Sequence, residues 1–260
     1  MQAVAVHGAS NPIGIGLIGK LLASEKNVYV DSNSLEQLTD YFADILSVTE
    51  GSILEMTADS NCRTIEFVNS EAPSQSSDIL VMTSGNHIKL NHGCQIIVHD
   101  LLSPNANETT WSSQIVHNWI DSILRNEEVA PDDSTHYWVS HRDVVSGLFD
   151  LLKCETLPSG ELNMCGRKSW NSSDVIEELK MLIRRSVHAT SQSFDEDDLM
   201  ARSPNVLSSK IPSIERPDLA KLHSTLCQVQ PDGWRTLTPL RVSLMEIIAA
   251  HLEGDGRGIQ

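Results

Sequence analysis

The sequence of 260 residues lacks several features that would indicate particular classes of protein. It has 35 acidic residues against 19 lysines and arginines, so its formal net charge is -16. No basic stripe is available to displace counterions from nucleic-acid phosphates. No apolar run approaches the roughly 20 residues that a membrane-spanning helix needs. We therefore expect neither a nucleic-acid-binding protein nor a membrane protein.

The cysteines offer no disulfide framework. There are five of them, an odd number, and none forms a C-x-x-C pair. This pattern favours reduced thiols in a core. The chain starts with Met1 and a short apolar run, without the basic and long apolar segments of a targeting peptide. We therefore expect a cytoplasmic protein.

The apolar pattern of the first hundred residues predicts strands that alternate with helices. Short apolar runs at 3–6, 28–30, 52–56, 64–68, 78–85 and 95–100 are typical of strands. Helices are predicted at 14–24 and, after a serine cap, over the amphipathic segment 32–46. This alternation favours a parallel sheet covered on both faces.

One link in this pattern is short. Only about ten residues separate the strand that ends near Gly85 from the strand that starts at Gln95, whereas a parallel crossover normally takes a dozen or more. Either the link runs extended across the end of the sheet, or a unit is missing. Further along, helices are predicted at 111–125, 142–153, 172–185 and 240–252, a strand at 160–166, and a polar, proline-punctuated loop at 190–217.

Several segments match one family in chain order. These are "VHGASNPIGIGLIGKLL", "VYVDSNS", "SDILVMTSGN", "IIVHDLLSPN", "HYWVSHRDVVSGLFDLL", "SGELNMCG" and "WRTLTPLRVSLMEII". Together they resemble the extended short-chain dehydrogenase/reductase family, the NAD-dependent nucleotide-sugar epimerases and dehydratases of carbohydrate metabolism. The first segment is similar to that family's G-x-x-G-x-x-G turn and first helix, and the second to its second strand with an acidic end.

The resemblance implies a fold and a division of the chain. The fold is a Rossmann-type parallel sheet with helices on both faces, shortened in the middle, plus a small C-terminal substrate-lobe remnant. Residues 1–165 form the Rossmann-like NAD(P)-binding domain, and residues 166–252 form the C-terminal substrate-lobe region, interleaved with the first. Residues 253–260 are expected to be a flexible tail.

The glycine-rich turn departs from the family pattern. Gly8 and Gly14 align with the first and third glycines of a dinucleotide loop, but Asn11 stands where the second would let backbone approach the pyrophosphate. The side chain of Asn11 occupies space that the phosphate needs, and Pro12 removes a backbone donor. The turn is therefore either a cofactor loop or a strand-to-helix turn retained for folding only.

Asp31 favours a bound cofactor. It ends the second predicted strand about twenty residues after the loop, where a carboxylate accepts from the adenosine ribose hydroxyls and repels a 2'-phosphate. This favours NAD over NADP, and a helix cap before "SNS" is the alternative role. The cofactor-binding residues implied by the resemblance are Gly8, Ser10, Asn11, Pro12, Ile13, Gly14, Asp31, Ser32, Thr83 and Ser84.

The family's catalytic pair, Tyr-x-x-x-Lys, is absent. In the family the lysine lowers the pKa of the tyrosine so that the phenolate can act as base. The residues four positions after Tyr29, Tyr41 and Tyr137 are Asn33, Ile45 and His141. The missing segment coincides with the short link after Gly85. In the family this segment contains two helices, one of which carries the Tyr-Lys pair, and both form the usual four-helix dimer interface. We therefore expect a monomer or a dimer with another interface.

The other candidate groups give weaker indications of a metal site or of acid/base catalysis. His87, His92, Cys94 and His99 approximate the spacing of a zinc half-site, but Cys94 and His99 bracket a predicted strand, so we expect no metal. His99 and Asp100 end that strand, where they could form an acid/base pair, although a structural histidine is the other reading. His99 and Tyr137 are poor candidates for a base, and we assign no catalytic residue.

Two functions follow from these observations. The first is a divergent NAD(P)-binding protein that acts on or binds a nucleotide-linked sugar. The second is a catalytically inactive, epimerase-like scaffold with a binding or regulatory role.

Overall fold

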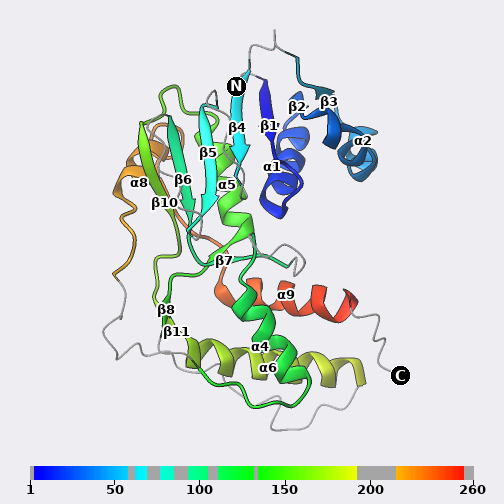
Figure 1. The fold of residues 1–260 in the computed structure, drawn as a ribbon, viewed down its shortest axis with the longest axis vertical. Coiled ribbons are helices and arrows are strands. Elements are labelled where there is room, and N and C mark those ends of the chain that lie inside the picture. The colour runs from blue at the N-terminus through cyan, green and yellow to red at the C-terminus, as the bar shows by residue number, and fades with distance from the viewer. Residues whose placement is uncertain are drawn as a thin grey trace. The chain divides into compact units, whose positions relative to one another are not determined.

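The computed structural model of the chain describes residues 3–57, 62–68, 77–84, 93–104, 111–131, 134–191 and 215–254 (Figure 1). Most of the link between Gly85 and Gln95, most of the loop predicted at 190–217, and the tail after 254 lie outside these ranges. The chain forms two compact units. The first comprises residues 1–99, 141–165 and 217–237, and the second comprises 100–140, 166–216 and 238–260.

A seven-stranded parallel sheet forms the centre of the first unit, in the order β10-β6-β5-β4-β1-β2-β3 (Figure 1). All strands predicted in the first hundred residues are present, with ends shifted by one or two residues. The strand order turns back at β1, from which the chain proceeds first to one edge and then to the other. This is the order of a Rossmann-type α/β fold. The strands are β1 (Val4–His7), β2 (Val28–Val30), β3 (Ile53–Glu55), β4 (Arg63–Phe67), β5 (Ile79–Thr83), β6 (Cys94–Val98) and β10 (Gly160–Met164).

The two faces of the sheet differ in polarity, because successive residues of a strand point to opposite faces. One row across β1, β4 and β5 consists of Val6, Ile65 and Ile79, all fully buried. The next row places His7, Glu66 and Leu80 side by side. The first of these faces is mainly apolar, with Arg63 beside Val4 at one end, and the other face is mixed.

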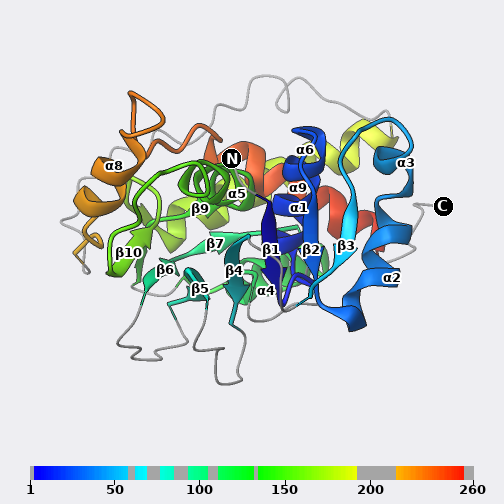
Figure 2. The same ribbon diagram turned by 90° about the horizontal axis from the view of Figure 1, so that it is seen from above.

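Three helices share one face of this sheet (Figure 2). Helix α1 (Pro12–Ala23) packs against α5 (His141–Leu151), and α5 packs against α8 (Ala220–Leu226). The α1 and α5 backbones approach closely at Gly16, where a Cβ atom would lie 2.8 Å from Cγ2 of Val145. Helix α8 was not predicted, since seven residues in a polar region give no periodicity.

The link between β5 and β6 is residues 84–93, and the two strands are parallel neighbours. Ten extended residues can span about 33 Å. A five-residue strand is about 17 Å long, which is roughly half of that span. The link is therefore long enough to return without a helix. The described residues of this link and of the link between β4 and β5 form no helix.

The two crossovers through α1 and α5 have opposite hands. The chain moves from β1 to β2 in one direction along the sheet and from β6 to β10 in the other, yet α1 and α5 lie on the same face. With β1-α1-β2 in the usual right-handed form, β6-α5-β10 is left-handed. Between β6 and α5 the chain first contributes residues 100–140 to the second unit.

The predicted helix over 32–46 is wrong in one respect: it is two helices, α2 (Ser32–Tyr41) and α3 (Ala43–Leu46). Phe42 lies at the break with only 5% of its surface exposed. Its ring lies beside Gly19 of α1, where an added Cβ would be 3.2 Å away. A tertiary contact thus interrupts the amphipathic pattern.

The second unit has its own core. Helices α4 (Gln114–Leu124), α6 (Ser172–Ser191) and α9 (Leu240–Gly254) supply most of its buried apolar side chains. Two short strand pairs complete it: β7 (Leu101–Leu102) with β9 (Val139–Ser140), and β8 (Thr135–His136) with β11 (Trp170–Asn171). The run "HYWVS" therefore contributes residues to both β8 and β9.

The glycines of α1 give a test of packing. A Cβ at Gly14 would lie 2.6 Å from the Ala9 carbonyl oxygen, which is backbone and cannot move aside. We expect Gly14→Ala to lower the free energy of unfolding by about 1–3 kcal/mol, as overpacking does. Gly19→Ala is the control, because the nearest atom is a ring edge and alanine gains up to about 1 kcal/mol of helix propensity. Urea unfolding measures both, and equal stabilities would contradict the assignment.

Candidate functional site

The turn between β1 and α1 needs its first and third glycines for backbone reasons alone. Gly8 has a φ of 62°, and a Cβ there would lie 2.6 Å from the Phe67 carbonyl oxygen of the neighbouring β4. Gly14 is equally close to the carbonyl oxygen of Ala9. Both glycines are therefore explained by the strand-to-helix turn, with no ligand required.

Asn11 closes the amino-terminal end of α1. Its side chain, in a residue only 1% exposed, accepts hydrogen bonds at Oδ1 from the backbone N–H of Ile13 (3.0 Å) and of Gly14 (2.9 Å). Its amide Nδ2 donates to the Gly8 carbonyl at 2.8 Å. Pro12 has no N–H, and the N–H of Ile15 donates to the Asn11 carbonyl at 2.9 Å. The first four residues of α1 thus have no unsatisfied N–H.

This arrangement does not fit a dinucleotide pyrophosphate. Such a group binds at a helix terminus by accepting from free backbone N–H groups. Here Asn11 Oδ1 accepts from two of those N–H groups and Pro12 lacks a third. The residues that the sequence aligns with a phosphate loop therefore form a self-capped turn.

Asp31 lies beside the same turn, at the end of β2. Its Oδ1 is 2.7 Å from Nδ1 of His7, and its Oδ2 accepts from the Gly8 N–H at 3.1 Å. Asp31 stands at the cap position of α2 but its carboxylate accepts no bond from that helix. Asp31 therefore occupies the cap position that the alternative role implies, with its backbone carbonyl accepting from the Ser34 N–H at 2.9 Å. A carboxylate has further lone pairs, so one ribose hydroxyl could still be accepted there.

The His7–Asp31 pair shifts the pKa values of both residues. The hydrogen bond from His7 lowers the pKa of the Asp31 carboxyl, and the bond to Asp31 raises the pKa of the His7 imidazole, with burial opposing both shifts. The sequence did not single out His7. Its signal was its position: His7 ends β1 and Asp31 directly follows β2, and these strands are parallel neighbours, so both residues lie at one edge of the sheet.

The other predicted cofactor residues lie at the same edge without joining this cluster. Ser10 and Ser32 are exposed. Thr83 ends β5, and Ser84 follows it and donates its backbone N–H to the Val98 carbonyl at 3.0 Å. Strand β4 lies between β1 and β5, which places Thr83 about 10 Å from the end of β1, or two strand spacings.

His99 and Asp100 have different partners. His99 Nε2 lies 2.8 Å from the side-chain oxygen of Asn163, and Nδ2 of Asn163 donates to the Asp218 carbonyl at 3.1 Å. In the second unit, Asp100 accepts from the backbone N–H of Tyr137 at 2.6 Å and lies 3.1 Å from Nδ1 of His136. The two residues therefore do not form an acid/base pair.

The zinc half-site is supported by nothing in the described residues. Within the described ranges, no group of three or more histidine, cysteine or acidic side chains could hold a metal ion. Burial raises the pKa of the Cys94 thiol to about 12, which disfavours the thiolate that binds zinc. His87 and His92 lie outside the described residues. No described helix is long and apolar enough to cross a membrane.

Comparison with known proteins identifies solved structures that share the fold of this chain. No family model and no curated protein matches the chain. Among solved structures, UDP-glucuronic acid 4-epimerase from Bacillus cereus is 11% identical with a TM-score of 0.57, over 97% of this chain and 99% of that chain. The chain has the fold of the UDP-sugar 4-epimerases.

Two further structures agree. UDP-glucose 4-epimerase from Thermotoga maritima, in complex with UDP-glucose, is 11% identical, with a TM-score of 0.54 and coverage of 97% of this chain and 99% of that chain. The enzyme WbmG from Bordetella bronchiseptica, in complex with NAD, is 10% identical, with a TM-score of 0.55 and coverage of 96% and 94%. The resemblance seen in the sequence is thus confirmed for the fold.

The His7–Asp31 pair gives a pH-dependent prediction. The raised pKa of His7 stabilises the fold below the ordinary histidine value of 6.5, and this contribution is lost as pH rises through the folded pKa. The lowered pKa of Asp31 stabilises it above the ordinary value of 3.8, and this is lost as pH falls through the folded pKa. The contribution of the pair is therefore largest between these limits.

A double-mutant cycle of His7→Gln and Asp31→Asn measures this coupling. We expect a larger coupling energy at about pH 5.5 than at about pH 8.5, because His7 is charged only at the lower pH. Proton NMR titration should give a pKa above 6.5 for His7, and a lower value in Asp31→Asn. The same coupling at both pH values would contradict the ion pair.

Proposed function

We propose that this chain is an epimerase-fold binding or regulatory scaffold that does not transfer hydride with a nicotinamide cofactor. The observation that carries the proposal is the side chain of Asn11, which accepts the N–H groups that a pyrophosphate would need. A dinucleotide could bind this turn only after displacing Asn11. That would break three hydrogen bonds of a buried side chain, and each buried polar group left unsatisfied costs about 1–3 kcal/mol.

A second feature supports the same proposal independently. No tyrosine in the sequence has a lysine four positions later, so the base of the resembling family has no counterpart. The missing base affects hydride transfer, and the self-capped turn affects retention of the cofactor. A scaffold needs neither.

One observation favours the second candidate, a divergent NAD-binding relative that acts on or binds a nucleotide-linked sugar. Asp31 ends β2 beside the first turn, and its carboxylate retains acceptor capacity for a ribose hydroxyl. A carboxylate there would repel a 2'-phosphate, which favours NAD over NADP. Solved structures of the same fold hold NAD or UDP-glucose.

We also propose a reducing compartment, the cytoplasm. All five cysteines are free thiols, and three of them are buried. Thiols of this kind persist where glutathione and thioredoxin keep them reduced.

Calorimetric titration with NAD and NADH tests the scaffold proposal. We expect no saturable binding to the wild type up to millimolar cofactor. The double variant Asn11→Gly, Pro12→Ala frees the helix-terminal N–H groups and should gain measurable NAD binding. Glycine is the mildest replacement at a cap position, and circular dichroism and urea unfolding check that the variant is folded before the titration.

Asn126→Gly is the matched control, because Asn126 is exposed and has a φ of 56°, a backbone that glycine adopts readily. It should bind no cofactor. Saturable binding of NAD to the wild type would overturn the scaffold proposal.

In that event Asp31→Ala tests the ribose contact of the second candidate. Affinity should fall about tenfold or more, the usual value of a hydrogen bond to a charged group. Slow hydride exchange on UDP- or dTDP-sugars would establish the second candidate, and unchanged affinity in Asp31→Ala would remove the ribose assignment.

A further inference from the structure

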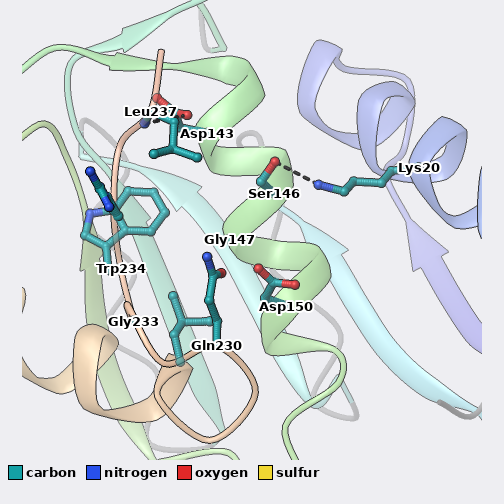
Figure 3. Close-up of a pocket in the computed structure, with 11 residues that line it drawn as sticks. Lys20, Asp143, Ser146, Gly147, Asp150, Gln230, Gly233, Trp234 and Leu237 are labelled. Atoms are coloured by element: carbon teal, nitrogen blue, oxygen red, sulfur yellow. Dashed lines mark hydrogen bonds between the residues drawn. The ribbon is translucent and has the colours of Figure 1, made fainter. Parts of the chain in front are cut away.

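A cavity of about 210 Å³ lies within the first unit, between α5 and the segment that follows α8 (Figure 3). None of the predicted cofactor residues lines it. Its one residue from α1 is Lys20, about 12 Å along the helix from Pro12 at 1.5 Å per residue. The cavity is therefore distinct from the turn described above.

Helix α5 provides one wall of the cavity. Its lining residues are Asp143, Ser146, Gly147 and Asp150, which stand at positions i, i+3, i+4 and i+7 and so share one face of the helix. The segment after α8 runs alongside this polar stripe and forms a second wall of the cavity. A polar stripe that lines a cavity can recognise a polar ligand.

The segment after α8 is held in place by the fold. A turn from Gln230 to Gly233, with Pro231 at its second position, is closed by the Gly233 N–H donating to the Gln230 carbonyl at 2.9 Å. Trp234 follows it, 2% exposed, and its Nε1 donates to the Cys165 carbonyl at 3.2 Å.

The helix wall is fitted to this segment. The Trp234 ring packs so closely on α5 that a Cβ at Gly147 would lie 2.6 Å from its Cζ3. Trp234 therefore fixes this segment against α5 on one side of the cavity.

The cavity holds an ammonium group with unused donors. Lys20 Nζ donates to the Ser146 hydroxyl at 2.8 Å, and no described carboxylate forms an ion pair with it. Burial lowers the pKa of Lys20, while the nearby Asp150 opposes that shift. Nζ also lies 5.1 Å from the centroid of the Phe149 ring, and two of its three N–H donors make no hydrogen bond with a described residue.

Hydrogen-bond acceptors lie on α5 and on the segment after α8. One oxygen of Asp150 bonds Lys153 at 2.8 Å, which leaves its other oxygen with no hydrogen bond to a described residue. The side-chain amide of Gln230, which Figure 3 shows directed toward Gly147, also makes no hydrogen bond with any described residue. The cavity therefore offers both signs of charge to one small molecule.

These charges select the ligand. A phosphate-like anion would be repelled by Asp143 and Asp150, and a simple cation would be repelled by Lys20 and Arg235. A molecule that carries both charges suits both sets of groups. Lys20 Nζ and Ser146 Oγ, 2.8 Å apart, can each donate to one oxygen of the same carboxylate.

We propose that this cavity binds a free α-amino acid as a zwitterion. Its carboxylate lies on Lys20 and Ser146, and its ammonium lies on Asp150. The cavity is smaller than the range of about 300–1,000 Å³ typical of drug-sized ligands, which suits a molecule of this size. This site is independent of whether the turn at Asn11 binds a dinucleotide.

Calorimetric titration of the full chain with each proteinogenic amino acid tests the proposal. We expect at least one to bind with a dissociation constant below about 10 mM, and its N-acetyl and carboxamide derivatives to bind about tenfold more weakly or worse, since each has lost one charge. Lys20→Met and Asp150→Asn should each weaken binding about tenfold or more. Lys26→Met and Glu36→Gln, which do not line the cavity, should leave it unchanged.

Several results would overturn the proposal. One is the absence of binding by every amino acid at 10 mM, and another is equal binding by the N-acetyl derivative, which needs no variant protein. A third is binding of glucose or inorganic phosphate that Lys20→Met abolishes, which would assign the cavity to another class of ligand. Dinucleotide titrations should be unaffected by these variants, since none of the predicted cofactor residues lines the cavity, and failure here leaves the scaffold proposal untouched.

Discussion

The hydrogen bonds that Ile13 and Gly14 donate to the side chain of Asn11 constrain everything around the first turn. They start α1 directly after β1, and α1 then packs on the apolar face of the sheet and against α5. The same bonds consume the helix-terminal donors that make such turns attractive to phosphates. One side chain therefore stabilises the fold and removes the chemistry that the fold most often supports.

The loss of the phosphate site and the loss of the catalytic base are consistent with each other. The described residues between β4 and β6 form no helix, and the sequence between these strands contains no tyrosine. An open cofactor loop without the base could not support hydride transfer, and neither could the base without a bound cofactor. What the chain retains is the sheet, its apolar helical face, and a second unit with a separate core of packed helices.

Much of the fold could be predicted because it rests on local patterns. Short runs of β-branched and aromatic residues such as Val28–Val30 favour strands, and Asn11 and Pro12 are unsuited to a phosphate loop by their own chemistry. The break at Phe42 and helix α8 could not be predicted, since both depend on contacts with distant segments. The partnership of His7 with Asp31 and the cavity around Lys20 depend on strand order and on three separate parts of the chain. No spacing in the sequence encodes these contacts.

The passage of the chain between the two units has a consequence for how the protein folds. The first unit is completed only when β10 pairs with β6, and residues 100–140 of the second unit lie between them in the sequence. No single cut can release either unit whole, so a proteolytic nick would leave fragments that must associate. Closing so long a segment before β10 can pair adds a non-local step to folding, and non-local contacts slow folding. Pairing of β10 with β6 in the first unit therefore depends on closure of a chain segment that belongs to the second unit.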